Sequence, residues 1–276
     1  MINLTSAPVF GQGIALDDVT LLHNVPSIFA SNHSFHRDER HYNLFKTVDV
    51  INALREEGYF PVYARTNGTR NQGAYNGVDT RKHMVRFTHR DFIESPLAVN
   101  DERPELILTN SHDGSSSFQI IAGLFRKVCS NGMMVMQQGV EERRIRHIGH
   151  TLDEVINSTL DVAHSLDCVM DTVNTMKGIN LNEKQRRDLA AEIAEARFGK
   201  DNVKTSEALL TLRRYEDNWQ PSLYNTFNVI QENMIKGGQR VTNRMMRPIT
   251  NIDTDININQ RMWNIVYNRM NELMVA

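Results

Sequence analysis

Two apolar runs separated by a short polar turn constrain the fold of this chain more than any other feature. The first run covers residues 106–108 and the second covers 118–125. Between them lies Asn110-Ser-His-Asp-Gly114, where Asn and Asp side chains can bond to the local backbone and Gly can adopt a positive φ. This arrangement predicts two antiparallel strands joined by a turn. A second turn at 130–132 leads into a short predicted strand at 133–136.

The residues before these strands predict one helix and two further strands. Apolar residues three apart make 47–57 a predicted helix, and Gly58 is a natural C-terminal stop. Residues 59–64 and 82–88 are predicted as strands, joined by an Asn/Gly-rich loop over 65–80. A helix followed by sequential strands predicts an α+β fold with a curved, mostly antiparallel sheet.

The hydrophobic pattern changes to helical spacing after residue 150. Thr151 and Glu154 have the spacing of a capping box, which begins a long amphipathic helix predicted to end at Gly178. Further helices are predicted over 182–198, 206–215, 223–235 and 260–274. We therefore divide the chain into an N-terminal arm (1–41), an α+β sheet core (42–149) and a helical region (150–276).

Composition excludes several classes of protein. Of the 276 residues, 40% are hydrophobic and 23% are charged, which is typical of a globular chain. No apolar run is long enough to cross a membrane, and the first residues do not resemble a secretory signal. Cys129 and Cys168 lie far apart, as expected in a reducing cytoplasm. Because no glycine-rich phosphate-binding loop is present, we expect no ATP and no other cofactor.

Positive charge is segregated along the chain, although the formal net charge is only -2. Cations gather in 65–90 and in 236–247, and acidic residues gather in the predicted helices. Such segregation predicts a basic groove that holds phosphates, with aromatic side chains available to stack on bases. The alternative is a solvated face, or arginines paired with the acidic helices. The candidate nucleic-acid-binding residues are Arg65, Arg70, Tyr75, Arg81, Lys82, Arg86, Phe87, Arg126, Lys127, Lys236, Arg240 and Arg244.

A catalytic site is a weaker interpretation. His112 and Asp113 adjoin Ser111, and Cys129 follows, which would suit a hydrolase or a nuclease. However, no nucleophile elbow surrounds Ser111 or Cys129, and turn chemistry accounts for the same residues. The carboxylates near the predicted strands have irregular spacing, so we expect neither a metal site nor a catalytic residue.

Several motifs give the chain a resemblance that extends from about Tyr42 to Leu273. They are Asn110-Ser-His-Asp-Gly114, Ala122-Gly-Leu-Phe-Arg126, Cys129-Ser-Asn-Gly132 and Asn228-Val-Ile-Gln-Glu-Asn233. In this order they resemble a phage and plasmid family of domains with no assigned function. The resemblance implies an origin in mobile elements and specifies little chemistry.

The order of helix, sheet and helix also resembles that of the single-strand annealing recombinases of phages. That resemblance implies a cytoplasmic homo-oligomer that holds single-stranded DNA and pairs it without ATP. It concerns architecture alone, and one fold can serve many functions. A host-interaction protein that does not bind DNA remains the main alternative, and a hydrolase or nuclease that uses His112, Asp113 and Cys129 is another.

Overall fold

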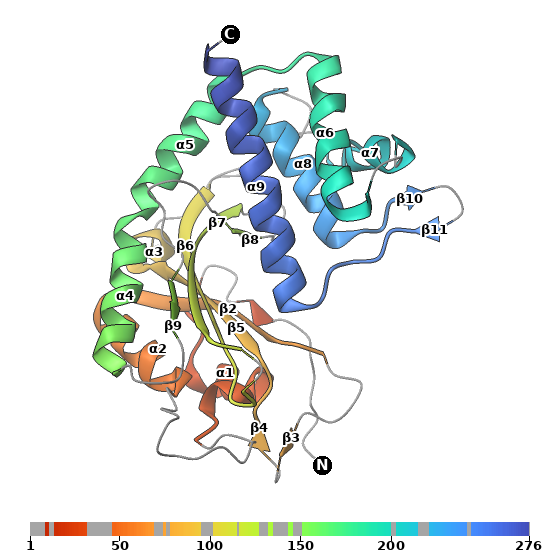
Figure 1. Ribbon diagram of the computed structural model, residues 1–276. Helices are drawn as coiled ribbons and strands as arrows, with labels where there is room; N and C mark the ends of the chain where they lie inside the picture. Colours follow the sequence, from red (N-terminus) through yellow and green to blue (C-terminus); the bar gives the residue numbers. More distant parts are fainter. Residues whose placement is uncertain are drawn as a thin grey trace. The chain divides into compact units, whose positions relative to one another are not determined.

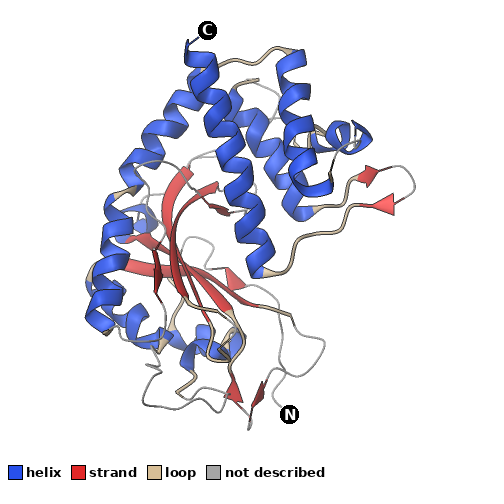
Figure 2. Ribbon diagram, in the orientation of Figure 1, coloured by secondary structure: helices blue, strands red, loops and turns tan. Residues whose placement is uncertain are grey.

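The computed structural model shows an α+β protein, as the sequence predicts. It describes residues 9–10, 14–31, 46–68, 74–75, 78–94, 102–114, 116–126, 132–134, 143–145, 151–199, 203–214, 221–241 and 244–275. Two compact units are present. The first comprises Met1–Gly132 and Val140–Leu166, and the second comprises Met133–Gly139 and Asp167–Ala276. The sheet belongs to the first unit, and the second is mainly helical (Figures 1 and 2).

The sheet of the first unit is antiparallel throughout its described pairings. Its neighbouring strands, in order, are β1 (Val9–Phe10), β2 (Tyr59–Thr66), β5 (His83–His89), β6 (Glu102–Asn110) and β7 (Phe118–Arg126), and β9 (Arg143–Ile145) also pairs with β7. The strand order continues from β7 to the short strand β8 (Gly132–Met134), and two further short strands, β3 (Ala74–Tyr75) and β4 (Val78–Asp79), pair with each other. The strands predicted on either side of Asn110–Gly114 are therefore confirmed.

The strand register separates an apolar face from a polar face. Phe87 lies opposite Leu106, which lies opposite Ala122, and all three are completely buried. Successive side chains along a strand alternate between faces, so the neighbouring residues point the other way. On that second face Tyr63 lies opposite Arg86. Met84, Ile107 and Ile121 share this second face and are also buried, so apolar side chains line both faces. The second face differs in carrying buried charges, and we call it the polar face.

Helices of the first unit pack on the apolar face. Thr47, the first residue of α2 (Thr47–Glu56), bonds to His83, which shares the face of Phe87. Asp161 of α4 (Leu152–His164) pairs with Arg143, whose register partner is Ile120 on the same face. The short helix α3 (Arg90–Glu94) continues directly from β5. The predicted boundary at 149 and 150 lies outside the described residues, and α4 falls within the first unit.

The described part of the predicted N-terminal arm contains helical structure. Helix α1 (Asp18–Asn24) begins at Asp17, whose carboxylate accepts a hydrogen bond from the Thr20 amide at 2.7 Å. The 3-10 helix η1 (Pro26–Phe29) follows, and Leu21 and Ile28 are completely buried. The sequence predicts an extended or irregular arm that packs on the core or on a neighbouring subunit, whereas residues 14–31 contain two helices with buried side chains. Each helix is too short for its periodicity to be recognised in the sequence.

The second unit surrounds a buried helix, α8 (Leu223–Lys236), which contacts the helices α6 (Glu183–Phe198), α7 (Val203–Leu209) and α9 (Ile252–Val275). The ring of Phe227 meets Trp263 edge-on at 6.0 Å, and Gln231 donates to Asn259 at 2.9 Å. A hairpin of β10 (Arg240–Val241) and β11 (Arg244–Met245) lies between α8 and α9.

The long helix predicted from 151 to 178 is wrong in one respect, because it is two helices. Both the backbone N–H and the hydroxyl of Ser165 donate to the Val162 carbonyl, and α5 (Leu166–Gly178) begins there. The capping box of Thr151 and Glu154 is confirmed. Within the described residues, none of the helices is long and apolar enough to cross a membrane.

Candidate nucleic-acid interface

The polar face of the sheet holds arginines in a network of ion pairs and aromatic contacts. Arg86 Nε donates to one oxygen of Glu105 at 2.5 Å, and Arg103 Nε donates to the other at 3.1 Å. The Arg86 guanidinium also lies 4.7 Å from the Tyr63 ring centroid and 4.9 Å from that of Phe125. Glu105 is completely buried, and Arg86 is 4% exposed. In this conformation the network holds neighbouring strands together, and a phosphate cannot reach Arg86.

Arg65, on the same face as Arg86, and two cations that precede β5 are also buried. Arg65 lies opposite Met84 and is 8% exposed. Arg81 makes a bidentate ion pair with Asp79, with both N–O distances at 2.8 Å. Such a pair satisfies the fork of the guanidinium and the two carboxylate oxygens together. Lys82 is buried beside it. These cations therefore contribute to the interior of the first unit.

The remaining candidates of the first unit lie elsewhere. Arg126 is buried at the end of β7, and the register of β6 and β7 places it on the opposite face from Arg86. Phe87 is completely buried in the apolar core, so its ring is not available for stacking in this conformation. Arg70, Lys127 and the side chain of Tyr75 lie outside the described residues. Among the candidate cations that the structure describes in this unit, Arg65 and Arg86 share one face of the sheet, and Arg126 lies on the other.

His112 lies in a buried polar cluster that joins α2 to the sheet. Thr47 Oγ1 is 2.8 Å from His83 Nε2 and 3.4 Å from His112 Nε2, and it accepts a hydrogen bond from the Asn110 amide at 3.0 Å. The two imidazole rings are stacked at 5.5 Å. Burial lowers the pKa of His83 to about 4, although a hydrogen bond with the Arg81 backbone opposes the shift, so this imidazole is neutral at pH 7.

The predicted turn at Asn110–Gly114 is confirmed. The Asn110 side chain accepts from the Ser111 amide at 2.8 Å, and Gly114 has a φ of 73°. Asp113 is partly exposed, and Cys129 lies outside the described residues. In the part of the chain that the structure describes, no three His, Cys, Asp or Glu side chains are placed to share a metal ion. The observed contacts of Asn110 and His112 are those of an internal scaffold.

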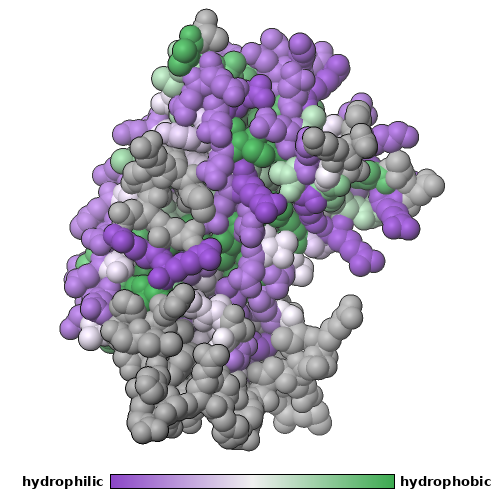
Figure 3. Space-filling view, in the orientation of Figure 1, coloured by the Kyte–Doolittle hydropathy of each residue, from purple (hydrophilic) through white to green (hydrophobic). Residues whose placement is uncertain are grey.

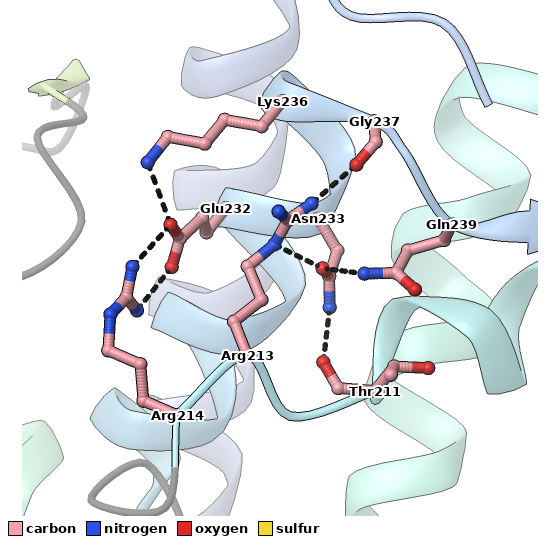
Figure 4. A network of polar contacts seen from close by, with 8 residues as sticks. All are labelled: Thr211, Arg213, Arg214, Glu232, Asn233, Lys236, Gly237 and Gln239. Atoms are coloured by element: carbon pink, nitrogen blue, oxygen red, sulfur yellow. Dashed lines mark hydrogen bonds and ion pairs between the residues drawn. The ribbon is translucent and has the colours of Figure 1, made fainter.

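A second polar network lies at the C-terminal end of α8 (Figure 4). Arg214 donates to both oxygens of Glu232, at 2.6 and 2.7 Å, and Lys236 donates to one of them at 2.8 Å. Burial opposes ionisation of Glu232, but the bonds from these two cations outweigh burial and hold its pKa below the ordinary value. The positive charge of Lys236 is thus paired within the second unit.

Asn233, one turn from the end of the same helix, uses the full bonding capacity of its amide. Its Nδ2 donates to the backbone oxygens of Leu209 and Thr211, each at 2.8 Å. Its Oδ1 accepts from Arg213 Nε at 2.7 Å and from Gln239 Nε2 at 2.8 Å (Figure 4). A primary amide offers two donors and two acceptor positions, so this completely buried group is saturated. Sequence reasoning missed this role, although the polar run Gln231 to Asn233 inside an apolar helix is the signal for it.

The network fixes the base of the β10–β11 hairpin. Arg213 donates to the Gly237 carbonyl as well as to Asn233, and Gln239 precedes β10 directly. Backbone bonds join Gly238 N to Met246 O at 2.8 Å and Met246 N to Gln239 O at 2.9 Å. Gly237 has a φ of 60°, and a Cβ there would collide with the backbone of Met246 and Arg247. Only glycine fits this close approach.

The hairpin and the residue pair after it expose three arginines. Arg240, Arg244 and Arg247 are exposed, and their side chains make no hydrogen bond or ion pair with the described residues. Figure 1 shows the hairpin extending away from α8, and Figure 3 shows hydrophilic and hydrophobic residues side by side around its position. Of the candidate cations in the second unit, Arg240 and Arg244 are therefore accessible to a phosphate, whereas Lys236 is paired.

Comparison with known proteins places the chain in a family. A family model described as a domain of unknown function, DUF932, matches residues 36–263. Two proteins of Escherichia coli (strain K12) are similar over 245 residues: UPF0380 protein YafZ is 33% identical and UPF0380 protein YfjQ is 32% identical. In each case 87% of this chain and 86% of the relative are covered. No solved structure matches. The chain thus belongs to the DUF932 family of domains of unknown function.

Proposed function

We propose that this chain is a mobile-element protein, of phage or plasmid origin, that binds single-stranded DNA and promotes annealing without ATP. The observation that carries the proposal is the β10–β11 hairpin, which exposes Arg240 and Arg244 without an acidic partner among the described residues. The motifs at Asn110–Gly114 and Asn228–Asn233, which resemble those of phage and plasmid domains, support the assignment to mobile elements.

Arginine without an internal partner is suited to phosphate. Its guanidinium is always charged, and its planar set of donors matches two phosphate oxygens. By contrast, the guanidinium of Arg81 already makes the same kind of bidentate contact with Asp79. Contacts made through phosphate carry no sequence information. The hairpin therefore supports binding that is indifferent to sequence, which annealing of arbitrary complementary strands requires.

The proposal assigns a later role to the buried cations of the first unit. Arg65, Arg81, Lys82, Arg86 and Arg126 are each at most 8% exposed, so contact with phosphate requires a rearrangement that uncovers them. Arg86 would then bring Tyr63 and Phe125 to the strand as stacking surfaces. We propose that DNA first contacts the hairpin. The rearrangement that uncovers the buried cations then takes place as copies of the protein assemble on the strand.

A salt titration tests the proposal. Affinity for a fluorescent single-stranded oligonucleotide is measured between 50 and 300 mM NaCl, on the order of the range in which phosphate contacts respond strongly. The test variant is Arg240→Gln/Arg244→Gln/Arg247→Gln. Three lost contacts lower the slope of log K against log salt by about 2, at about 0.7 for each phosphate on a single strand. Absence of binding by the wild-type protein at the lowest salt overturns the proposal.

A matched variant separates the hairpin from the effect of total charge. Lys184→Gln/Arg187→Gln/Lys204→Gln removes three exposed cations from α6 and α7 in the same unit. Both variants have the same net charge, so long-range attraction to DNA falls equally. We expect the control to keep the wild-type slope. Equal losses in the two variants would show that the hairpin is not the contact. Light scattering with and without oligonucleotide tests for the homo-oligomer.

A further inference from the structure

The β10–β11 hairpin carries an exposed apolar side chain among its cations. Met245 is 60% exposed and lies opposite Arg240 in the hairpin register. Paired residues of an antiparallel hairpin share a face, so a methionine and an arginine project together. Apolar surface is transferred out of water favourably, so a partner that covers the Met245 side chain gains free energy from the contact.

The next residue, also a methionine, is buried. Met246 is 8% exposed, and its backbone bonds to Gly238 and Gln239 at the base of the hairpin. Two consecutive methionines therefore have opposite roles: Met246 anchors the hairpin to the second unit, and Met245 points out. Asn233 and Gly237 hold the base of the hairpin from which Met245 projects.

We infer that Met245 is a base-contacting wedge of the proposed DNA-binding hairpin, an inference that rests on the proposed function. Arg240 holds a phosphate on the face that it shares with Met245, Arg244 holds one from the other face, and the Met245 side chain packs against the face of a base. Apolar side chains, methionine included, insert between bases in proteins that unstack nucleic acid, and every base has an apolar face. The occupant is thus an unstacked base of a single strand. Holding bases apart from one another keeps them available for pairing with a complementary strand.

The inference is tested with the full chain and two oligonucleotides of equal length. One is an ordinary single strand that carries the fluorescent base 2-aminopurine at one position, and the other has the same phosphates but no bases. Met245→Ala is expected to weaken binding of the ordinary strand by about fivefold to tenfold, with an unchanged salt slope. On the strand without bases, wild type and Met245→Ala bind equally. The rise in 2-aminopurine fluorescence on binding is lost in the variant.

A matched control is Leu212→Ala, which removes another exposed apolar side chain of the second unit, 38% exposed. It should bind both strands like wild type. The inference is overturned if Met245→Ala binds the ordinary strand like wild type while the triple arginine variant does not, an outcome that leaves the proposed function intact. If wild type binds no oligonucleotide but sediments with phosphatidylserine vesicles in a Met245-dependent way, the hairpin is a membrane contact, and both proposals fail.

Discussion

Replacing Asn233 tests whether its saturated amide holds the second unit together. Asn233→Ala removes four hydrogen bonds at once: two to backbone oxygens, one from Gln239 and one from the charged Arg213. At about 1 kcal/mol for each neutral bond and about 2 kcal/mol for the charged one, the sum is about 5 kcal/mol. Water replaces part of this loss, because Thr211 and Arg213 are exposed. We therefore expect Asn233→Ala to lower the free energy of unfolding of the second unit by about 3 kcal/mol.

A second asparagine of the same motif provides the control. Asn228 is also buried, with 2% of its surface exposed, but its side-chain amide donates to Tyr224 O within its own helix at 2.9 Å. Asn228→Ala therefore removes one local bond and should cost about 1 kcal/mol. Both variants create a similar cavity in α8. The difference between their free energies of unfolding therefore isolates the hydrogen bonds that Asn233 makes to residues outside α8.

Urea unfolding followed by tryptophan fluorescence measures this difference. Both tryptophans, Trp219 and Trp263, belong to the second unit, so the signal reports that unit. The midpoint for Asn233→Ala should lie well below that for Asn228→Ala, with similar slopes. Equal midpoints would refute the reasoning, since they would mean that the four bonds add nothing beyond the loss of side-chain volume.

Three further predictions concern the buried groups and the hairpin base. Because the pKa of His83 is about 4 when folded and about 6.5 when unfolded, the unfolded chain takes up a proton first as pH falls. Stability should drop from about pH 6.5 to pH 4, by up to about 3 kcal/mol, and urea midpoints of His83→Gln should show a smaller drop over the same range. Arg86→Gln leaves Glu105 with Arg103 alone, and it should lower the free energy of unfolding, measured by thermal denaturation, by about 3 kcal/mol. The double variant Arg86→Gln/Glu105→Gln should recover part of this loss. Wild-type stability of Arg86→Gln would contradict the prediction. Gly237→Ala should weaken DNA binding without any change of charge, because the hairpin base must shift. Gly238→Ala has open space around its Cβ position and should bind DNA more tightly than Gly237→Ala. Identical affinities of the two variants would show that the close approach at Gly237 is unimportant.

Much of the fold can be predicted from local sequence patterns. The capping box at Thr151 begins α4 as predicted, and a second one, formed by Asn182 and Gln185, begins α6 at the start of the predicted helix 182–198. Helix α2 ends within one residue of the prediction. The predicted helix 260–274 is longer, because α9 begins at Ile252. Helix α7 ends at Leu209 rather than at 215, and residues 211–214 instead supply partners for α8.

The sequence by itself therefore determined the order of helices and strands, the turn at Asn110–Gly114 and the segregation of charge, because spacing over a few residues decides each of these. The tertiary structure decided which charges are available. Arg86 meets Glu105 across two strands, and Glu232 holds Arg214 and Lys236, while Arg240 and Arg244 meet no carboxylate of the described residues. Whether a cation belongs to the interior or is available to a ligand depends on burial and on partners distant in the sequence, and only folding brings these together.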